Sequence, residues 1–250
     1  MRRSLVRLAL FSVLLAIVPV FAGCGVSVAH QPVTPPTATP TAPPRPGAFY
    51  FTTSDGVTLG GKILGKGKTA LIFSNGKGLT MGLWEAVAQT MADRGYMSFL
   101  YDYRGLGQSQ GWDIPAQRED DLRAAITVAQ AHGATKVVLI GSSFGALLSA
   151  RLASEAHAAA IVLVSSPLRD SGIVLSDGYL QTLAAPKLLI VSEQDGSFIS
   201  DTQHIYEMSA QPKQIAIYPG RQHGPALLVL EHGADSMQRL IAFLNKYAPV

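Results

Sequence analysis

The sequence has very little cysteine, since Cys24 is the only one among 250 residues. A single cysteine excludes an intramolecular disulfide, so the fold cannot depend on such a bond. Common metal and nucleotide motifs are also missing: there is no Cys/His cluster, no H-E-x-x-H and no complete phosphate-binding P-loop. We therefore expect no metal and no cofactor.

Acidic residues are absent before Asp55, whereas Arg2, Arg3 and Arg7 lie near the start of the chain. These three arginines account for the formal net charge of +3, because the remaining basic residues equal the acidic ones in number. The rest of the chain is therefore close to neutral and has no basic stripe along which phosphates could bind. We expect no nucleic-acid partner.

Residues 1–23 have the layout of a secretory signal peptide. A basic start precedes an apolar run from Leu8 to Ala22, which is short for a membrane-spanning helix but suits a signal-peptide core. The run ends in Phe21-Ala22-Gly23-Cys24, which resembles the lipobox of bacterial lipoproteins, although Phe21 replaces the usual aliphatic residue. This resemblance implies that Cys24 is lipidated and holds the protein at the cell membrane, facing outside the cytoplasm. The alternative is an ordinary secretory signal followed by an incidental cysteine.

Residues 24–47 contain a stretch rich in proline, threonine and alanine. Such a composition cannot bury a core and favours extended polyproline conformations. We interpret this segment as a semi-rigid linker to one folded domain over residues 48–250, which is long enough to bury a core.

Within residues 48–250, short apolar runs alternate with amphipathic segments. A hairpin is expected between Ala48 and Leu64, with its turn at Ser54-Asp55-Gly56. Further strands are expected at 69–73, 97–101, 136–140, 159–164, 187–192 and 213–218, and helices at 81–94, 117–131 and 144–155. This alternation predicts an α/β fold with a mostly parallel, doubly wound sheet.

The segment Gly141-Ser142-Ser143-Phe144-Gly145 lies between an expected strand and an expected helix, and has the pattern G-x-S-x-G. In that context the pattern forms a sharp turn that raises its central side chain above the sheet. Ser143 is central, because only Ser143 has glycine two positions before it and two positions after it. The five residues alone are equally compatible with a glycine-rich turn that has no catalytic role.

Five features follow one another along the chain: an Asn-Gly loop, a D-x-R-G-x-G-x-S loop, the G-x-S-x-G turn, an Asp after a strand and a His after the last strand. In this order, over about residues 49–248, they resemble the α/β-hydrolase superfamily. The sequence looks closest to lid-poor bacterial hydrolases of the serine-aminopeptidase-like and dienelactone-hydrolase-like groups. The resemblance implies an N-terminal antiparallel hairpin, a minimal cap and a Ser-His-Asp triad.

A serine hydroxyl needs a general base, because the neutral hydroxyl is a poor nucleophile. His223 lies between Gly220 and Gly224 in the loop after the last expected strand, where the superfamily places its catalytic histidine. His232 is the alternative, although it falls within the expected helix that follows.

The acid that orients the histidine is expected at Asp195, just past the strand at 187–192. The superfamily often has Gly-x-x-Asp at this point, and here Ser192 stands in place of the glycine. The rival carboxylates are Glu193, Asp201 and Asp170.

An oxyanion hole needs backbone N–H groups aimed at the developing charge. One is expected from Phe144, directly after the nucleophile. The superfamily usually has His-Gly in the loop that supplies the other, and this chain has Asn75-Gly76-Lys77. By analogy we expect the second donor at the N–H of Lys77. We expect the side chain of Lys77 to be solvated, and the alternative is that it adds positive charge near the site.

Two further segments bear on the site. The loop from Asp102 to Ser109 is expected to be a hydrogen-bonded brace rather than part of the chemistry. Cap domains of this fold are usually inserted where this chain has only residues 165–187, so a short excursion and an open, shallow site are expected.

Taken together, these features favour a carboxylesterase-like serine hydrolase that acts as a monomer on a small acyl substrate. Peptidase, thioesterase and acyltransferase remain alternatives that would use the same triad. A non-catalytic binding protein with the same fold is the alternative from another class, because fold alone does not fix function.

Overall fold

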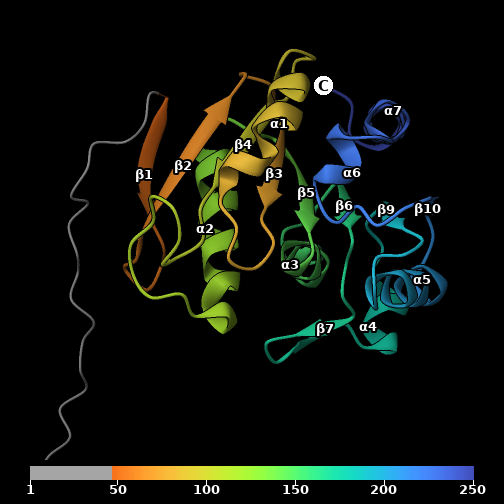
Figure 1. Ribbon diagram of the computed structural model, residues 1–250. Helices are drawn as coiled ribbons and strands as arrows, with labels where there is room; N and C mark the ends of the chain where they lie inside the picture. The colour runs from red at the N-terminus through yellow and green to blue at the C-terminus, as the bar shows by residue number, and fades with distance from the viewer. Residues whose placement is uncertain (1–46) are drawn as a thin grey trace, which may run out of the picture. The chain divides into compact units, whose positions relative to one another are not determined.

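The computed structural model describes residues 47–250. The signal peptide, Cys24 and nearly all of the expected linker therefore lie outside the described residues. The described part is built around an eight-stranded sheet with the order β1-β2-β4-β3-β5-β6-β9-β10 (Figure 1). A separate two-stranded ribbon, β7-β8, completes the strands of this part.

The strands are β1 (Ala48–Thr52), β2 (Thr58–Leu64), β3 (Thr69–Ser74), β4 (Met97–Tyr101), β5 (Lys136–Ser142), β6 (Ala160–Val164), β7 (Arg169–Asp170), β8 (Ile173–Val174), β9 (Lys187–Ser192) and β10 (Lys213–Tyr218). The α-helices are α1 (Glu85–Ala92), α2 (Arg118–Ala131), α3 (Phe144–Leu152), α4 (Asp177–Thr182), α5 (Phe198–Met208), α6 (Ala226–Val229) and α7 (Gly233–Tyr247). Short 3₁₀ turns, η1 (Met81–Trp84) and η2 (Pro115–Gln117), precede α1 and α2.

The sheet is antiparallel at its N-terminal edge and parallel elsewhere. β1 pairs with β2 and β2 with β4 in antiparallel fashion, whereas β4, β3, β5, β6, β9 and β10 run parallel. The N-terminal hairpin turns at Gly56, whose φ of 86° is readily adopted only by glycine. The predicted α/β fold with its N-terminal hairpin is thus confirmed.

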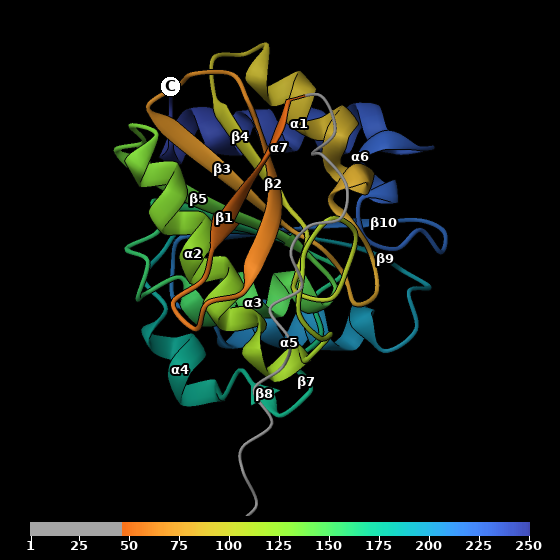
Figure 2. The same ribbon diagram turned by 90° about the vertical axis from the view of Figure 1, so that its left-hand side faces the viewer.

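Helices cover both faces of the sheet, as a doubly wound fold requires. Figure 2 shows α1, α6 and α7 on one face and α2, α3, α4 and α5 on the other. Successive side chains of a strand point to opposite faces, so Leu71 and Phe73 pack with the first group and Ile72 packs with the second. These core side chains are fully buried, and their removal from water is the main stabilising contribution to the fold.

The carboxyl ends of the parallel strands meet at one edge. Ser74 pairs with Gly141, Ser142 with Val164, and Ser192 with Tyr218. The loops that follow these strands therefore gather at this edge, where open α/β sheets bind their ligands.

The segment between β6 and β9 is short, and contains only the β7-β8 ribbon and α4. It corresponds to the minimal cap expected from the sequence. None of the helices within residues 47–250 has the length and apolar character needed to cross a membrane.

Candidate active site

Ser143 stands at the turn between β5 and α3 with φ 51° and ψ −124°. A left-handed φ is uncommon for a residue with a side chain and costs about 1–3 kcal/mol. The turn is tight, because a Cβ on Gly141 would lie 2.1 Å from the carbonyl oxygen of Gly145, and a Cβ on Gly145 would lie 2.3 Å from that of Ser74. Glycine is thus required at both positions, and Ser143 remains partly exposed.

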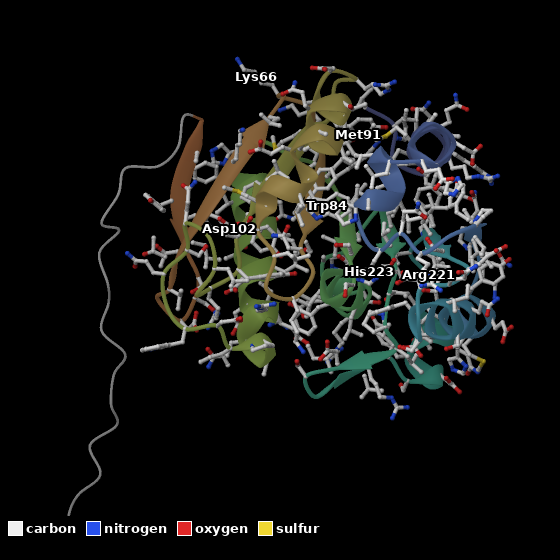
Figure 3. All side chains as sticks on the ribbon, in the orientation of Figure 1. Lys66, Trp84, Met91, Asp102, Arg221 and His223 are labelled. Carbon is white, nitrogen blue, oxygen red and sulfur yellow. The ribbon has the colours of Figure 1, made fainter. Side chains whose placement is uncertain are left out.

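Asp195 and His223 are brought together from the loops after β9 and β10. The Nδ1 atom of His223 lies 2.8 Å from Oδ1 and 3.0 Å from Oδ2 of Asp195. The Asp195 side chain is 7% exposed and that of His223 is 37% exposed. Figure 3 labels His223 beside the carboxyl ends of the parallel strands. A buried carboxylate thus holds one ring nitrogen of a histidine whose other side is accessible.

The His223 loop packs against the residue that precedes the elbow serine. A Cβ on Gly224 would lie 3.4 Å from Cβ of Ser142 and 3.5 Å from its Oγ. No hydrogen bond in the described part of the chain joins Ser143 to the imidazole. Catalytic hydrogen bonds are often long or poorly aligned until substrate binds, so a nucleophile and its base need not be hydrogen-bonded here.

The rival carboxylates have other partners or positions. Asp201 accepts a hydrogen bond from the backbone N–H of Leu168 at 3.1 Å, and Asp170 pairs with Lys77. Glu193 is exposed. The rival histidine, His232, lies at the N-terminal cap of α7, and its Nε2 atom is 2.9 Å from the carbonyl oxygen of Pro219. None of these rivals forms a carboxylate–histidine pair like that of Asp195 and His223.

The two segments expected to supply the oxyanion donors both adjoin Ser143. Phe144 is the first residue of α3, so its backbone N–H has no acceptor within the helix. The loop after β3 approaches from the other side, since a Cβ on Gly76 would lie 3.4 Å from Cβ of Ser143. This loop is fixed by Asn75, whose buried side-chain amide donates to the carbonyl oxygen of Tyr101 at 2.8 Å.

The Lys77 side chain is exposed, as expected for a solvated lysine, and it is also paired with a carboxylate. Its Nζ atom lies 2.5 Å from Oδ1 of Asp170 in β7, and 5.6 Å from the centre of the Phe144 ring. The ion pair joins two loops that are far apart in sequence, which a reading of local patterns does not reveal. It places a paired cation near the ring of Phe144.

The loop from Asp102 to Ser109 is a brace, as predicted. Asp102 accepts hydrogen bonds from the backbone N–H groups of Met81 at 2.7 Å and Gln108 at 2.9 Å. Ser109 Oγ donates to the carbonyl oxygen of Asp102 at 2.6 Å. These bonds use backbone groups, so they order the loop rather than reach toward substrate.

The same brace contains a buried ion pair. Arg104 Nε lies 2.8 Å from Asp121 Oδ1, and Arg104 Nη1 lies 2.7 Å from Asp55 Oδ2. Burial raises the pKa of Asp121 to about 6, against the opposing effect of Arg104. The hydrogen bond from Arg104 lowers the pKa of the more exposed Asp55.

Arg118 was not singled out by the sequence, yet it is fully buried next to the elbow. Its guanidinium carbon lies 4.6 Å from the centre of the Tyr103 ring and 5.4 Å from that of Phe144. It also forms an ion pair with Asp113. An arginine at the start of a helix ordinarily faces solvent, so only the fold reveals that its cation supports the Phe144 ring.

Metal chemistry has no cluster to support it within residues 47–250, where no group of three or more His, Cys, Asp or Glu side chains could hold an ion. The arrangement instead combines a strained serine, a histidine oriented by a carboxylate and the N-terminus of a helix. Such a set can transfer an acyl group by way of the serine.

Residues 65–216 match the family described as Serine aminopeptidase, S33, over more than half of the chain. The chain belongs to this family. This chain is 24% identical to the uncharacterized protein YfhR of Escherichia coli K12 over 226 residues, which covers 78% of each protein. It is also 32% identical over 107 residues to the pimeloyl-[acyl-carrier protein] methyl ester esterase of Proteus mirabilis, covering 42% of this chain and 39% of that protein.

Solved structures show the same fold. The Pyrococcus furiosus esterase Pf2001 matches with a TM-score of 0.69 and 18% identity, over 80% of this chain and 90% of that one. The esterase RhEst1 of Rhodococcus sp. ECU1013 matches with a TM-score of 0.67 and 18% identity, over 81% of this chain and 100% of that one. This protein is therefore a hydrolase with the α/β-hydrolase fold.

Proposed function

We propose that this protein is a serine hydrolase that cleaves a carboxylic ester, or a related acyl bond, in a small substrate. Ser143 is the nucleophile, His223 the general base and Asp195 the residue that orients the imidazole. The backbone N–H groups of Phe144 and Lys77 bind the oxyanion. No cofactor takes part.

The geometry supports the following sequence of steps. The Ser143 hydroxyl attacks the acyl carbon while His223 takes its proton, which gives a tetrahedral oxyanion. When the oxyanion collapses, the bond to the leaving group breaks and His223 passes the proton to the departing oxygen. His223 then takes a proton from water as the water attacks the acyl-enzyme, and when the second oxyanion collapses His223 returns this proton to Ser143 as the acid leaves.

The observation that carries this proposal is the pairing of Asp195 with His223 next to the strained Ser143 turn. Backbone strain of this kind persists where surrounding structure enforces it, and it concentrates at functional sites. A protein that merely binds a ligand on this fold needs neither the left-handed serine nor a buried carboxylate behind a histidine. The non-catalytic alternative is therefore disfavoured.

Among hydrolytic reactions, the surroundings favour an ester over a peptide with a free amino end. An aminopeptidase substrate carries an ammonium group near its scissile bond, which an unpaired carboxylate close to Phe144 would attract. The neighbouring carboxylate of Asp170 is already paired with Lys77. The Proteus mirabilis relative, named as a methyl ester esterase, supports the same preference. Thioesterase and acyltransferase reactions would use the same residues.

The test compares the wild-type protein with Ser143→Ala, using a p-nitrophenyl ester and a fluorophosphonate probe. We expect turnover to fall by at least about 10⁴-fold and labelling to disappear. Ser142→Ala is the matched control, because it removes the adjacent hydroxyl and leaves the nucleophile in place. Labelling that persists in Ser143→Ala, or a wild-type protein that neither labels nor turns over, would contradict the proposal.

For the location of this activity, we propose a lipid anchor at Cys24 and a bacterial cell-membrane site facing outside the cytoplasm. The support is the leader and lipobox pattern of the sequence. We expect full-length protein in the membrane fraction and Cys24→Ser to be released or left unprocessed. Wild-type protein found only in the soluble fraction would argue against the anchor.

A further inference from the structure

The backbone on both sides of His223 is held by two buried serine hydroxyls. The loop has glycines at both of its ends, Gly220 with φ 97° and Gly224 with φ 61°. Glycine has the widest choice of backbone conformations, so these two residues alone would leave the orientation of the loop poorly defined. The loop must therefore be fixed by contacts outside itself.

Ser192 provides the first of these contacts. It is the last residue of β9 and fully buried, and its Oγ donates a hydrogen bond to the carbonyl oxygen of Gln222 at 2.7 Å. The carbonyl oxygen of Ser192 also accepts from the backbone N–H of Asp195 at 3.3 Å. One residue thus contacts both the turn that presents the acid and the residue before the histidine.

Ser165 provides the second contact, on the other side of the histidine. It directly follows β6, is fully buried, and its Oγ accepts a hydrogen bond from the backbone N–H of Gly224 at 3.1 Å. Its own backbone is left-handed, with φ 52°. Like Ser143, it is a non-glycine residue in a costly conformation at the carboxyl edge of the sheet.

We propose that Ser165 and Ser192 are positioning residues for His223, an assignment that rests on the proposed function of the triad. Ser192 fixes the residue before His223 and Ser165 fixes the residue after it, while Asp195 holds the ring. Three neighbouring parallel strands, β5, β6 and β9, thus set the position of the imidazole relative to Ser143. Displacements of about 1 Å in such a geometry can cost about 10²-fold in rate.

The first experiment separates positioning from substrate binding. In Ser192→Ala and Ser165→Ala we expect kcat for a p-nitrophenyl ester to fall about 10- to 100-fold, with KM within about twofold of wild type. Ser192→Thr keeps a hydroxyl and should recover most of the lost kcat. Ser165→Gly removes the same hydroxyl as Ser165→Ala, but glycine accepts the left-handed backbone without strain. A loss of kcat in this variant therefore reports the missing hydrogen bond and not backbone strain.

The matched control removes a similar bond at the opposite end of the sheet. Thr69 is the first residue of β3, is buried, and donates from Oγ1 to the carbonyl oxygen of Pro249 at 2.9 Å. Thr69→Val loses that bond far from the triad, so we expect kcat to stay within about twofold of wild type. An equal loss of kcat in Thr69→Val would assign the effect to general destabilisation and overturn the proposal.

A spectroscopic readout tests the same assignment without any substrate. The His223 Nδ1–H proton bonded to Asp195 should give a downfield NMR signal in the wild-type protein, and solvent exchange should broaden it in Ser192→Ala and Ser165→Ala. An unchanged signal in both variants would overturn the positioning role. If the two variants broaden the signal but the wild-type protein has no hydrolase activity, only the proposed function is contradicted.

Discussion

The ammonium of Lys77 lies 2.5 Å from the carboxylate of Asp170, and this contact passes over the end of β5. Lys77 follows β3 and Asp170 lies in β7 after β6, while β5 is the strand between β3 and β6. The pair therefore bridges the two loops that flank Ser143. Burial opposes ionisation of Asp170, but the hydrogen bonds from Lys77 and Ser171 outweigh it and lower the pKa of this carboxyl.

Releasing Lys77 from its partner should change which esters are preferred. In Asp170→Asn the ammonium next to Phe144 is unpaired and can attract a carboxylate on the substrate. We expect kcat/KM for a carboxylate-bearing ester to rise about 3- to 10-fold relative to a neutral ester of equal length. The double variant Asp170→Asn/Lys77→Met should lose this gain, and a gain that survives in it would show that Lys77 is not responsible.

Replacing the acid of the triad should leave the fold intact and nearly abolish turnover. Asp195→Asn keeps the size of the side chain but can no longer stabilise the imidazolium that forms during attack, so we expect kcat to fall about 10³- to 10⁴-fold. Glu193→Gln is the control, since Glu193 is the exposed carboxylate two residues earlier. Steady-state kinetics on a p-nitrophenyl ester compare the two, and an equal loss in both variants would remove Asp195 from its assigned role.

The close approach of α3 to β3 should tolerate no side chain at Gly145. A Cβ there would meet the carbonyl oxygens of Ser74 at 2.3 Å and Asn75 at 2.6 Å. We expect Gly145→Ala to lower the free energy of unfolding by about 3 kcal/mol or more, measured by urea denaturation. Gly178→Ala in α4 meets nothing within 4 Å and should be neutral or stabilising by up to about 1 kcal/mol. Similar stabilities of the two variants would contradict the tight packing.

Because Lys187 is buried, the free energy of unfolding should increase with pH in the alkaline range. Lys187 in β9 is fully buried, and its ammonium donates to the carbonyl oxygens of Leu183 at 2.8 Å and Ala210 at 2.7 Å. Burial, with a smaller effect of Lys213, lowers its pKa from 10.5 to about 8. The unfolded chain therefore binds more protons than the folded protein between these values, so folding becomes more favourable as pH rises from 8 to 10.5.

The Lys187→Met variant isolates this effect. We expect the free energy of unfolding of the wild-type protein, relative to the variant, to increase by about 2–3 kcal/mol across that range. Urea denaturation at a series of pH values measures the difference, in which the titration of other groups cancels. A flat difference would show that the lysine is not held away from solvent.

The fold could be predicted from the sequence because the patterns that indicate strands and turns are local. β-branched apolar runs such as Val137 to Ile140 form buried strands, and glycines mark the turns at Gly56 and around Ser143. The α/β architecture depends mainly on such repeated local signals. Chain order then narrowed the candidate acid and base to Asp195 and His223, which the structure brings within hydrogen-bond distance.

What the sequence did not reveal depends on contacts between distant loops. The Lys77–Asp170 pair, the stacking of Arg118 on Phe144 and the two serine bonds to the His223 loop all join segments more than twenty residues apart. Charged and hydroxyl side chains are ordinarily found at the surface, so composition gives no reason to place them inside. The β7-β8 ribbon is likewise too short to leave a periodic signal.

The chain carries two tryptophans, and they sit in opposite environments. Trp84 is fully buried with its ring 5.2 Å from that of Phe73, whereas Trp112 is 65% exposed in the loop that Arg118 anchors through Asp113. Emission from Trp84 should be blue-shifted and shielded from dissolved iodide, while emission from Trp112 should be red-shifted and readily quenched. Intrinsic fluorescence can thus follow unfolding of the interior and movement of that loop separately, without any added dye.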